Sequence, residues 1–160
     1  MAHRIRPMLS SDKATLHDIL NTIPEFSSDD VLVAREVIDN YLRDPAGSGY
    51  NVLVAEIEKD VVAYICYGPT PLTKGTWDIY WMATLPEKQG HGIGSDLLGL
   101  AESKIVESGG RLIMIETSSR SDYEKALHFH QNHCYEVICR LSDFYAPGDD
   151  KLILQKKLGR

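Results

Sequence analysis

The sequence predicts one α/β domain built on a mixed β-sheet. Its 160 residues are enough for a single domain with a sizeable core, and we take residues 1–160 as that domain. The predicted elements follow the order strand, two helices, three strands, helix, strand, helix and two strands. Because a helix joins the fourth strand to the fifth, we expect these two strands to run parallel in a right-handed βαβ unit.

Two helices are predicted after a short edge strand at residues 3–8, where Pro7 cannot donate a ladder hydrogen bond. Asp12, with the two serines before it, can cap the first helix. Ser27, with Asp30 three residues later, starts the second. The expected core sides are apolar residues at helical spacing: Leu16, Ile19, Leu20 and Ile23, then Val33, Val37, Ile38 and Tyr41.

The rest of the chain is rich in strand-forming residues. Residues 50–58 and 61–68 are predicted to form a hairpin, and 76–85 a third strand with alternating side chains. The nearly continuous apolar run "RLIMIET" is typical of a strand covered on both faces. The other expected elements are a helix with Leu97, Leu98, Ala101 and Ile105 on one side that stops at Gly109 and Gly110, a short helix at 122–133, and closing strands at 135–145 and 151–158.

Three glycines fall within the seven residues "QGHGIGS" (89–95), between a predicted strand and a predicted helix. Glycine costs folding entropy, so such a cluster suits backbone amides that must approach a ligand closely. A helix N-terminus adds unpaired N–H groups and the positive end of the helix dipole, which favour phosphate. An ordinary glycine-rich turn is the alternative. No Lys follows Gly94 as in a P-loop, and Ser95 occupies the third glycine position of a dinucleotide fingerprint, so both nucleotide motifs are weak.

The element order, with "QGHGIG" after the fourth strand, resembles the GNAT superfamily of acetyl-CoA-dependent N-acetyltransferases. The family's pyrophosphate motif is Gln/Arg-x-x-Gly-x-Gly/Ala, and Gln89, Gly92 and Gly94 match its fixed positions. A second stretch, "ALHFHQNHCYE", is similar to the family's Ala-x-x-Phe-Tyr-x-x-x-Gly-Phe segment. The resemblance covers almost the whole chain. It implies a mostly antiparallel central sheet flanked by helices, with the parallel βαβ unit at the acetyl-CoA site.

The resemblance also implies which residues bind acetyl-CoA. The glycine-rich backbone would hold the pyrophosphate, and a bulge in the fourth strand would splay two parallel strands to admit the pantetheine arm. A backbone N–H there can polarise the thioester carbonyl. The residues assigned to this role are Met82, Ala83, Thr84, Gln89, Gly90, His91, Gly92, Ile93, Gly94, Ser95 and Tyr123.

Two positions depart from the family pattern. His130 occupies the position of the family's usual general acid, a tyrosine, which leaves the proton donor open. Cys134 and Tyr135 replace the Gly-Phe pair, a change that is expected to affect only a turn and a core aromatic residue.

Two residues are the leading catalytic candidates. N-acetylation needs an uncharged amine, so a base must accept a proton. Glu116 ends an apolar strand, where an apolar setting would raise the carboxyl pKa, and it matches an acidic residue that some family members use as base. The alternative is an exposed or salt-bridged carboxylate. His130, as an imidazolium, could protonate the departing thiolate, or it could only pack beside the cofactor. Tyr80, Tyr123 and Tyr145 are substitute donors.

The stretch "HFHQNHC" raises a zinc alternative through His128, His130, His133 and Cys134. Its two- and three-residue spacings only partly share a helix face, and no Cys-rich or His-Glu-x-x-His partner accompanies it. We therefore expect no metal.

Composition limits the partners. A net charge of −6 argues against nucleic acid, no apolar run is long enough for a membrane, and three cysteines without a Cys-x-x-Cys pair favour a cytoplasmic protein. The sequence therefore predicts acetyl transfer to a small-molecule or peptide amine by direct attack, without an acyl-enzyme. A non-catalytic acyl-CoA-binding or regulatory domain is the rival, and a dinucleotide oxidoreductase is disfavoured. A homodimer is compatible with the sequence.

Overall fold

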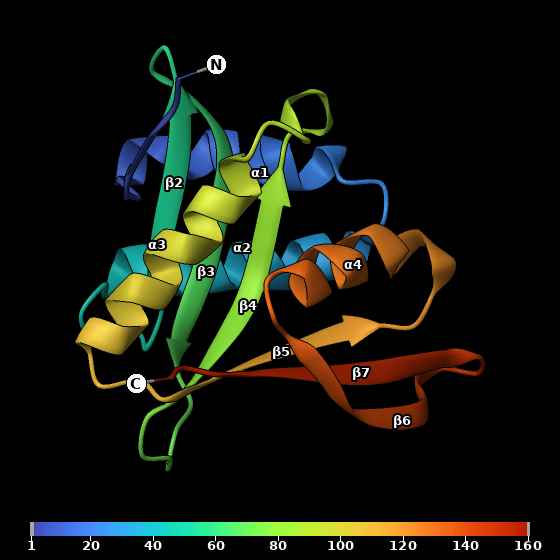
Figure 1. Ribbon diagram of the computed structural model, residues 1–160. Coiled ribbons are helices and arrows are strands. Elements are labelled where there is room, and N and C mark those ends of the chain that lie inside the picture. The colour runs from blue at the N-terminus through green and yellow to red at the C-terminus, as the bar shows by residue number, and fades with distance from the viewer. Residues whose placement is uncertain (1, 160) are drawn as a thin grey trace.

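In the computed structural model, which describes residues 2–159, seven strands form one sheet in the order β1-β2-β3-β4-β5-β7-β6 (Figure 1). All neighbouring strands are antiparallel except β4 and β5, which are parallel. The predicted mixed, mostly antiparallel sheet is therefore confirmed. The strands are β1 (Arg4–Pro7), β2 (Asn51–Ile57), β3 (Asp60–Pro69), β4 (Thr76–Thr84), β5 (Leu112–Ser118), β6 (Glu136–Ala146) and β7 (Asp149–Lys157).

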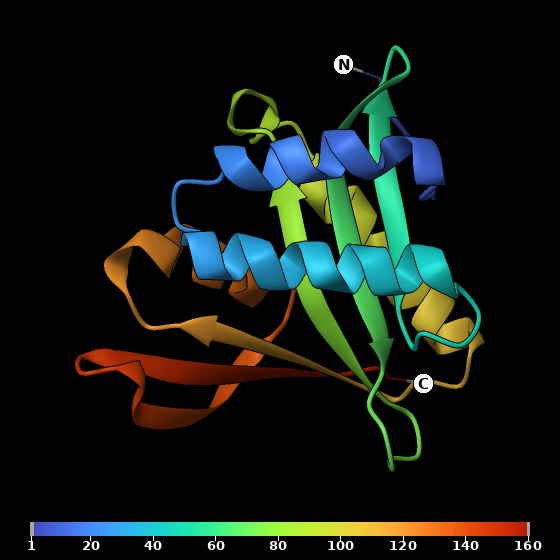
Figure 2. The ribbon, with the colours of Figure 1, turned by 180° about the vertical axis from the view of Figure 1, so that it is seen from behind.

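Helices cover both faces of the sheet. The first pair, α1 (Lys13–Thr22) and α2 (Ser28–Arg43), lies on one face, and α3 (Ile93–Glu107) and α4 (Glu124–Asn132) lie on the other (Figure 2). Short 3₁₀ turns precede three of them at η1 (Ser10–Asp12), η2 (Pro86–Lys88) and η3 (Ser121–Tyr123). The resulting three layers enclose two hydrophobic cores, one on each side of the sheet.

The two cores follow the alternation of the strands. On the α3 side, Leu97, Leu98 and Ile105 pack against residues such as Ile65 and Ile79. On the other side, the first two helices bury their apolar faces against alternate residues of β2 and β3. Burial of this apolar area is the main favourable contribution to the fold.

One predicted helix face is wrong in part. Val31, Ala34 and Ile38 form the buried stripe of α2, whereas Val33 is 50% exposed. Four apolar residues in succession, "VLVA", allow two helical stripes with the same period. Contact with the sheet selects between them, and periodicity alone does not.

A bulge in β4, opposite β3, lies next to the point where β4 and β5 separate. The register between β3 and β4 shifts so that Cys66 faces Trp81 and Tyr67 faces Ile79, which leaves Tyr80 as the extra residue. The parallel pairing of β4 with β5 ends at Ile79. Beyond this point the two strands diverge, as Figure 1 shows. The splayed pair implied by the family resemblance is therefore present.

The turn after α4 keeps its glycine-like geometry without glycine. Cys134 has a φ of 69°, in the left-handed region, and Tyr135 after it is only 2% exposed. The two departures at these positions thus alter a turn and a core aromatic residue, as expected.

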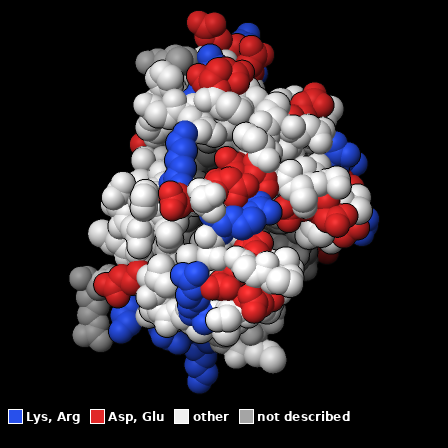
Figure 3. All heavy atoms as spheres, turned by 90° about the vertical axis from the view of Figure 1, so that its right-hand side faces the viewer, with Lys and Arg blue, Asp and Glu red and all other residues white. Residues whose placement is uncertain are grey.

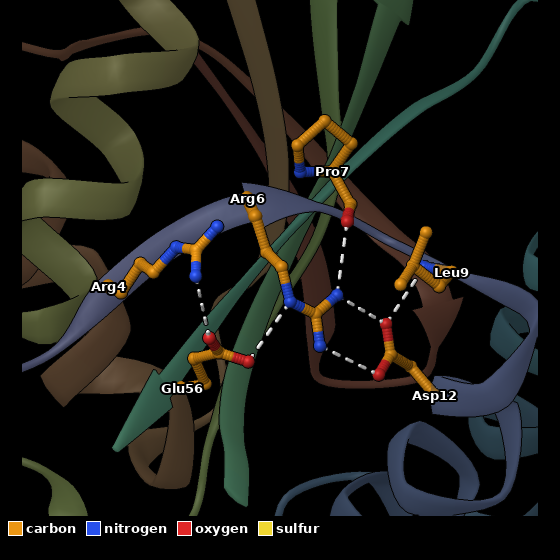
Figure 4. A network of polar contacts seen from close by, with 6 residues as sticks. All are labelled: Arg4, Arg6, Pro7, Leu9, Asp12 and Glu56. Carbon is orange, nitrogen blue, oxygen red and sulfur yellow. Dashed lines mark hydrogen bonds and ion pairs between the residues drawn. The ribbon is translucent and has the colours of Figure 1, made fainter. Parts of the chain in front are cut away.

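An ion-pair network joins the start of the chain to the sheet (Figure 4). The guanidinium of Arg6 donates to both carboxylate oxygens of Asp12, at 2.7 and 3.0 Å, and to Glu56 at 3.0 Å. Asp12 also accepts from the Leu9 N–H at 2.8 Å. The network ties β1 to β2 and to the turn that starts α1, and the Arg6 guanidinium lowers the pKa of Asp12.

We expect Asp12→Asn to lower the free energy of unfolding by about 3 kcal/mol, because it leaves Arg6 without its bidentate partner in a largely buried site. The Asp12 contribution is present above the unfolded carboxyl pKa of about 4 and is lost as pH falls through the lowered folded value. The difference in unfolding free energy between wild type and variant should therefore become smaller as the pH falls. Urea unfolding at several pH values measures it. Asp18→Asn, on the exposed side of α1, is the control, and an equal effect of the two variants would contradict this role.

Candidate functional site

A cavity of about 300 Å³ lies between β4, the start of α3 and α4. It begins where the parallel strands separate, and α4 lies beside that opening (Figure 1). Ten of the eleven residues that the sequence assigned to cofactor binding line it: Met82, Ala83, Thr84, Gln89, Gly90, Gly92, Ile93, Gly94, Ser95 and Tyr123. His91 does not line it, because its ring turns back and donates to the Lys88 carbonyl at 3.2 Å.

Two glycines of the loop have backbone conformations that other residues rarely adopt. Gly90 and Gly92 have φ values of 79° and 82°. A Cβ at either position would meet no protein atom within 4 Å, so the space above the loop is open. The loop thus presents bare backbone to the cavity.

The first turn of α3 supplies hydrogen-bond donors at the same place. Gly92 is the N-cap residue, and no side chain caps the helix. Asp96 is the first residue whose N–H bonds back to the Gly92 carbonyl, at 3.0 Å. The N–H groups of Ile93, Gly94 and Ser95 therefore have no acceptor within the helix, and the positive end of the helix dipole adds to them. This end of the cavity suits an anion such as pyrophosphate.

The open edge of β4 presents further backbone groups. The Leu85 N–H donates to the Val62 carbonyl at 2.9 Å, and in antiparallel pairing every second residue bonds the same neighbour. By this alternation, Met82 and Thr84 direct their backbone groups away from β3, toward the gap beside β5. The Thr84 carbonyl indeed accepts from Gln89 at 3.2 Å on that side. An extended ligand could add to this edge as a strand does.

A bridge crosses the cavity between the glycine loop and α4. Lys125 donates to the side-chain oxygen of Gln89 at 2.6 Å, and both residues line the cavity. The ammonium group brings positive charge next to the α3 N-terminus. Lys125, Ala126 and Phe129 were not among the residues expected from the sequence. Together with Asp122 they follow the 3–4-residue spacing of one helix face, the signal that could have identified them.

His130 lies in the cavity wall as a neutral imidazole. It is 9% exposed, its ring lies between those of Phe129 and Tyr135, and its Nδ1 has no hydrogen-bond partner among the described residues. Burial, with a smaller effect of His133, lowers the pKa of His130 to about 4. Burial therefore favours the neutral ring over the imidazolium form that was one of the two alternatives for His130.

Both ring nitrogens of His133 form hydrogen bonds. Its Nδ1 donates to the Phe129 carbonyl at 2.7 Å, so its Nε2 is left to accept from the Ser95 hydroxyl at 3.0 Å. Both ring nitrogens of this zinc candidate are thus in use. Within residues 2–159, no three His, Cys, Asp or Glu side chains cluster as metal ligands.

Glu116 lies on β5 just beyond the last residue that pairs with β4. Its side chain is 54% exposed and contacts the Lys151 ammonium at 2.8 Å, and it does not line the cavity. The apolar setting expected for this carboxylate is therefore absent, because its side chain lies on the exposed face of the strand, whereas Ile115 and Thr117 on either side of it are buried. Glu116 lies next to the point where β4 and β5 separate.

The three tyrosines considered as substitute proton donors lie in different surroundings. Only Tyr123 lines the cavity; burial, with a smaller effect of Asp30, raises its pKa to about 12, so the phenol keeps its proton. Tyr80 is the bulge residue and packs against Tyr50 at 5.3 Å between ring centroids. Tyr145 is 47% exposed on β6. Geometry thus favours Tyr123 among the tyrosines.

The comparisons with known proteins agree with this architecture. Residues 13–134 match the model of the Acetyltransferase (GNAT) family. A crystal structure from Desulfovibrio desulfuricans, of a protein assigned to the GNAT family of acetyltransferases, superimposes with a TM-score of 0.95 at 33% identity, covering 99% of this chain and 100% of that one.

More distant structures share the fold. The ribosomal-protein-S18-alanine N-acetyltransferase from Escherichia coli has a TM-score of 0.78 at 14% identity, covering 99% of this chain and 96% of that one. An aminoglycoside 6′-N-acetyltransferase complexed with coenzyme A has a TM-score of 0.77 at 15% identity, covering 98% of each chain. No curated protein matches the chain.

We expect Gly92→Val to weaken acetyl-CoA binding by about 100-fold, because a β-branched residue resists the positive φ and places its side chain where the anion would sit. Calorimetric titration measures the affinity. The matched control is Gly109→Val at the other end of α3, which has a φ of 83° and equally open surroundings. Unchanged affinity in a folded Gly92 variant, or equal losses in both, would reject this placement.

Proposed function

The chain belongs to the GNAT family of acetyltransferases, and from this premise we propose that it transfers the acetyl group of acetyl-CoA to a primary amine. The observation that carries the proposal is the coincidence, in one cavity, of the uncapped α3 N-terminus and the open edge of β4. The first suits a pyrophosphate and the second suits an extended amide chain. Acetyl-CoA carries both, in that order along its length.

The amine is proposed to attack the thioester directly. An acyl-enzyme needs an activated nucleophile, and none of the three cysteines lines the cavity. Burial raises the pKa of the Cys66 thiol, which keeps it protonated and unreactive. The gap-facing N–H of Met82 is the proposed partner of the thioester carbonyl, where it would stabilise the negative charge that develops during attack.

Proton transfer is assigned to two groups. Glu116 stays the proposed base, acting from the edge of the opening, where the Lys151 ammonium contacts the carboxylate and holds it in position. His130 is proposed to donate a hydrogen bond to the departing sulfur as a neutral imidazole, a form that can polarise a reacting group. Tyr123, whose hydroxyl donates to the Glu25 carbonyl at 3.4 Å, is the alternative proton donor.

The remaining expectations about partners stay proposals. No helix of the described chain is both long and apolar enough to cross a membrane. A cytoplasmic location rests on the unpaired cysteines, and the acceptor is a small-molecule or peptide amine rather than a nucleic acid. We propose β6 as the interface of the homodimer, because this strand has five exposed apolar side chains: Val137, Ile138, Leu141, Phe144 and Tyr145.

A turnover measurement distinguishes the proposed enzyme from the rival function, a non-catalytic acyl-CoA-binding domain. Incubation with acetyl-CoA and a panel of primary amines, followed by thiol release and product mass, should give acetylated amine in step with free coenzyme A. Binding of acetyl-CoA without any amine-dependent thiol release would favour the rival.

We expect Glu116→Gln to lower the turnover by about 100-fold or more while acetyl-CoA affinity is retained, since the amide keeps the shape but accepts no proton. Lys151→Met separates a positioning effect from a proton effect, because it removes the ammonium partner of the carboxylate and leaves the carboxylate itself in place. Rates over pH 5–9 provide the readout. If turnover and its acidic limb persist in Glu116→Gln, another group is the base.

We expect His130→Ala to lower the saturated rate by about 100-fold, with acetyl-CoA affinity changed much less, because a donor to the leaving sulfur is lost. His130→Tyr restores a donor and should recover part of the rate. Since the pKa of His130 is about 4, no limb of the wild-type profile between pH 6 and 8 should disappear in the alanine variant. A wild-type saturated rate in His130→Ala would leave this residue with a packing role only.

A further inference from the structure

The Ser95 hydroxyl lies at the end of the cavity that suits the pyrophosphate. Ser95 belongs to the first turn of α3 and lines the cavity together with the glycine loop. Among residues 89–95 it is the one residue with a hydroxyl group. A hydroxyl can donate or accept a hydrogen bond, so its effect on a phosphate depends on where its hydrogen points.

His133 determines where this hydrogen points. His133 is the C-cap residue of α4 and does not itself line the cavity. Its Nδ1 lies 2.7 Å from the Phe129 carbonyl oxygen, and its Nε2 lies 3.0 Å from the Ser95 Oγ. A carbonyl oxygen only accepts, so Nδ1 carries a hydrogen and Nε2 of the neutral ring is left as an acceptor. The Ser95 hydroxyl therefore donates to His133.

This direction does not match a phosphate ligand. With its hydrogen on the side of His133, the Ser95 oxygen has only lone pairs left for the cavity. The oxygens of an ionised phosphate also only accept, so the two groups repel each other. If the hydroxyl turned toward the phosphate instead, Nε2 of the neutral ring would lose its donor, which costs the free energy of that hydrogen bond.

One proton on the imidazole removes the mismatch. Imidazole is the side-chain group that most readily exchanges a proton at physiological pH. With both ring nitrogens protonated, Nδ1 still donates to the Phe129 carbonyl and Nε2 donates to the Ser95 Oγ. The hydroxyl hydrogen is then free for a phosphate oxygen, and the positive charge of the ring attracts the phosphate as well.

Phe129 fixes the imidazole relative to Ser95. The ring of Phe129 lies 4.4 Å from that of His133 between centroids. It also lies against the first turn of α3, because a Cβ at Gly94 would be 3.5 Å from it. The neighbouring His130 is the neutral ring of the cavity wall, on which His133 acts electrostatically. The contact between His133 and Ser95 is thus part of the packing of α4 on α3.

The carboxylates of α3 that flank this contact have other partners. Asp96, next to Ser95 in the chain, contacts the His3 ring at 2.7 Å. Glu102, about two turns further along the helix, contacts Lys156 at 2.8 Å. Neither pair involves the imidazole of α4, so its Nε2 is left to the Ser95 hydroxyl.

The charge of the protein makes an additional proton useful. The chain has a net charge of −6, and the proposed cofactor is an anion. Figure 3 shows acidic as well as basic side chains around the hollow on the α4 side of the molecule. Lys125, the lysine of α4 that lines the cavity, is already bound to Gln89. A proton taken up at His133 would add positive charge at the phosphate end when the anion binds.

We propose that His133 is a positioning residue for the cofactor, which takes up a proton as the pyrophosphate binds and thereby turns the Ser95 hydroxyl into a donor to that phosphate. The inference rests on the proposed function, because it concerns the same cofactor site. One proton moves from solvent to Nε2, and no covalent bond of the cofactor changes. Because binding and protonation favour each other equally, the affinity is highest where the ring is protonated and falls as pH rises.

The test uses 3′-dephospho-coenzyme A, which keeps the pyrophosphate but lacks the phosphomonoester that would itself titrate near pH 6. Calorimetric titration in buffers with different heats of ionisation measures the protons taken up on binding. At pH 7.5 we expect uptake of about half a proton. Between pH 6 and pH 8.5 we expect the affinity to fall at least about fivefold.

Two variants locate the proton. His133→Gln keeps a hydrogen-bonding side chain that does not titrate, and it should abolish the uptake and reduce the pH dependence to less than about twofold. Ser95→Ala removes only the hydroxyl and should reduce the uptake by about half or more, because the charge of the imidazolium still attracts the phosphate. His128→Gln, at an exposed position of the same helix, is the matched control and should leave the uptake unchanged.

The outcomes separate this inference from the proposed function. Binding without proton uptake, or an uptake that is unchanged in His133→Gln or in Ser95→Ala, would overturn the role of His133 and leave acetyl transfer intact. Loss of the uptake in His91→Gln but not in His133→Gln would place the proton in the glycine loop and overturn it as well. No binding of either dephospho-coenzyme A or acetyl-CoA would overturn the cofactor site, and the proposed function with it.

Discussion

The early end of the pairing between β4 and β5 is the constraint on which the cavity depends. Four residue pairs, from Thr76 with Leu112 to Ile79 with Ile115, hold the two parallel strands together. The bulge at Tyr80 then turns β4 away from β5. The other edge of β5 stays paired with the antiparallel strand β7 as far as Ser118. Backbone groups that a continuous sheet would satisfy are left open, and α3 begins beside them. The sheet thereby gives up part of its hydrogen bonding at one place, and that place is the candidate site.

The glycine loop and α4 complete the site from opposite sides. Gly92 starts α3 without a side-chain cap, so donors remain available for a ligand. Lys125 and His130 approach from α4, the first as a cation bound to Gln89 and the second as a buried neutral ring. Lys125 and the uncapped N-terminus of α3 thus bring positive charge to the part of the cavity where phosphates would bind. A bound acetyl-CoA would extend from the glycine loop along the open edge of β4.

Most of the fold could be predicted from the sequence, because local patterns determine it. The strand from Thr76, the glycine stretch and the apolar face of α3 each have a periodicity or turn chemistry that allows few alternatives. The site was predicted less evenly. Its backbone part follows from the glycines, but the setting of Glu116 and of His130 depends on contacts between distant elements. Lys151 comes to Glu116 from β7, and Tyr135 with Phe129 encloses His130. The buried side of α2 was missed at Val33 for the same reason, since two stripes have the same period.

Amide hydrogen exchange with and without coenzyme A probes the backbone groups on which the proposed cofactor site depends. Saturating ligand should slow exchange about tenfold or more at Met82 and at Ile93, Gly94 and Ser95, whose N–H groups face the cavity or lack an acceptor within α3. Amides of β1 and β2, which lie at one edge of the sheet and away from the β4–β5 opening, should exchange at the same rate with and without the ligand. Protection that avoids both the gap-facing edge of β4 and the first turn of α3, in a protein that binds the ligand, would contradict this placement of the cofactor.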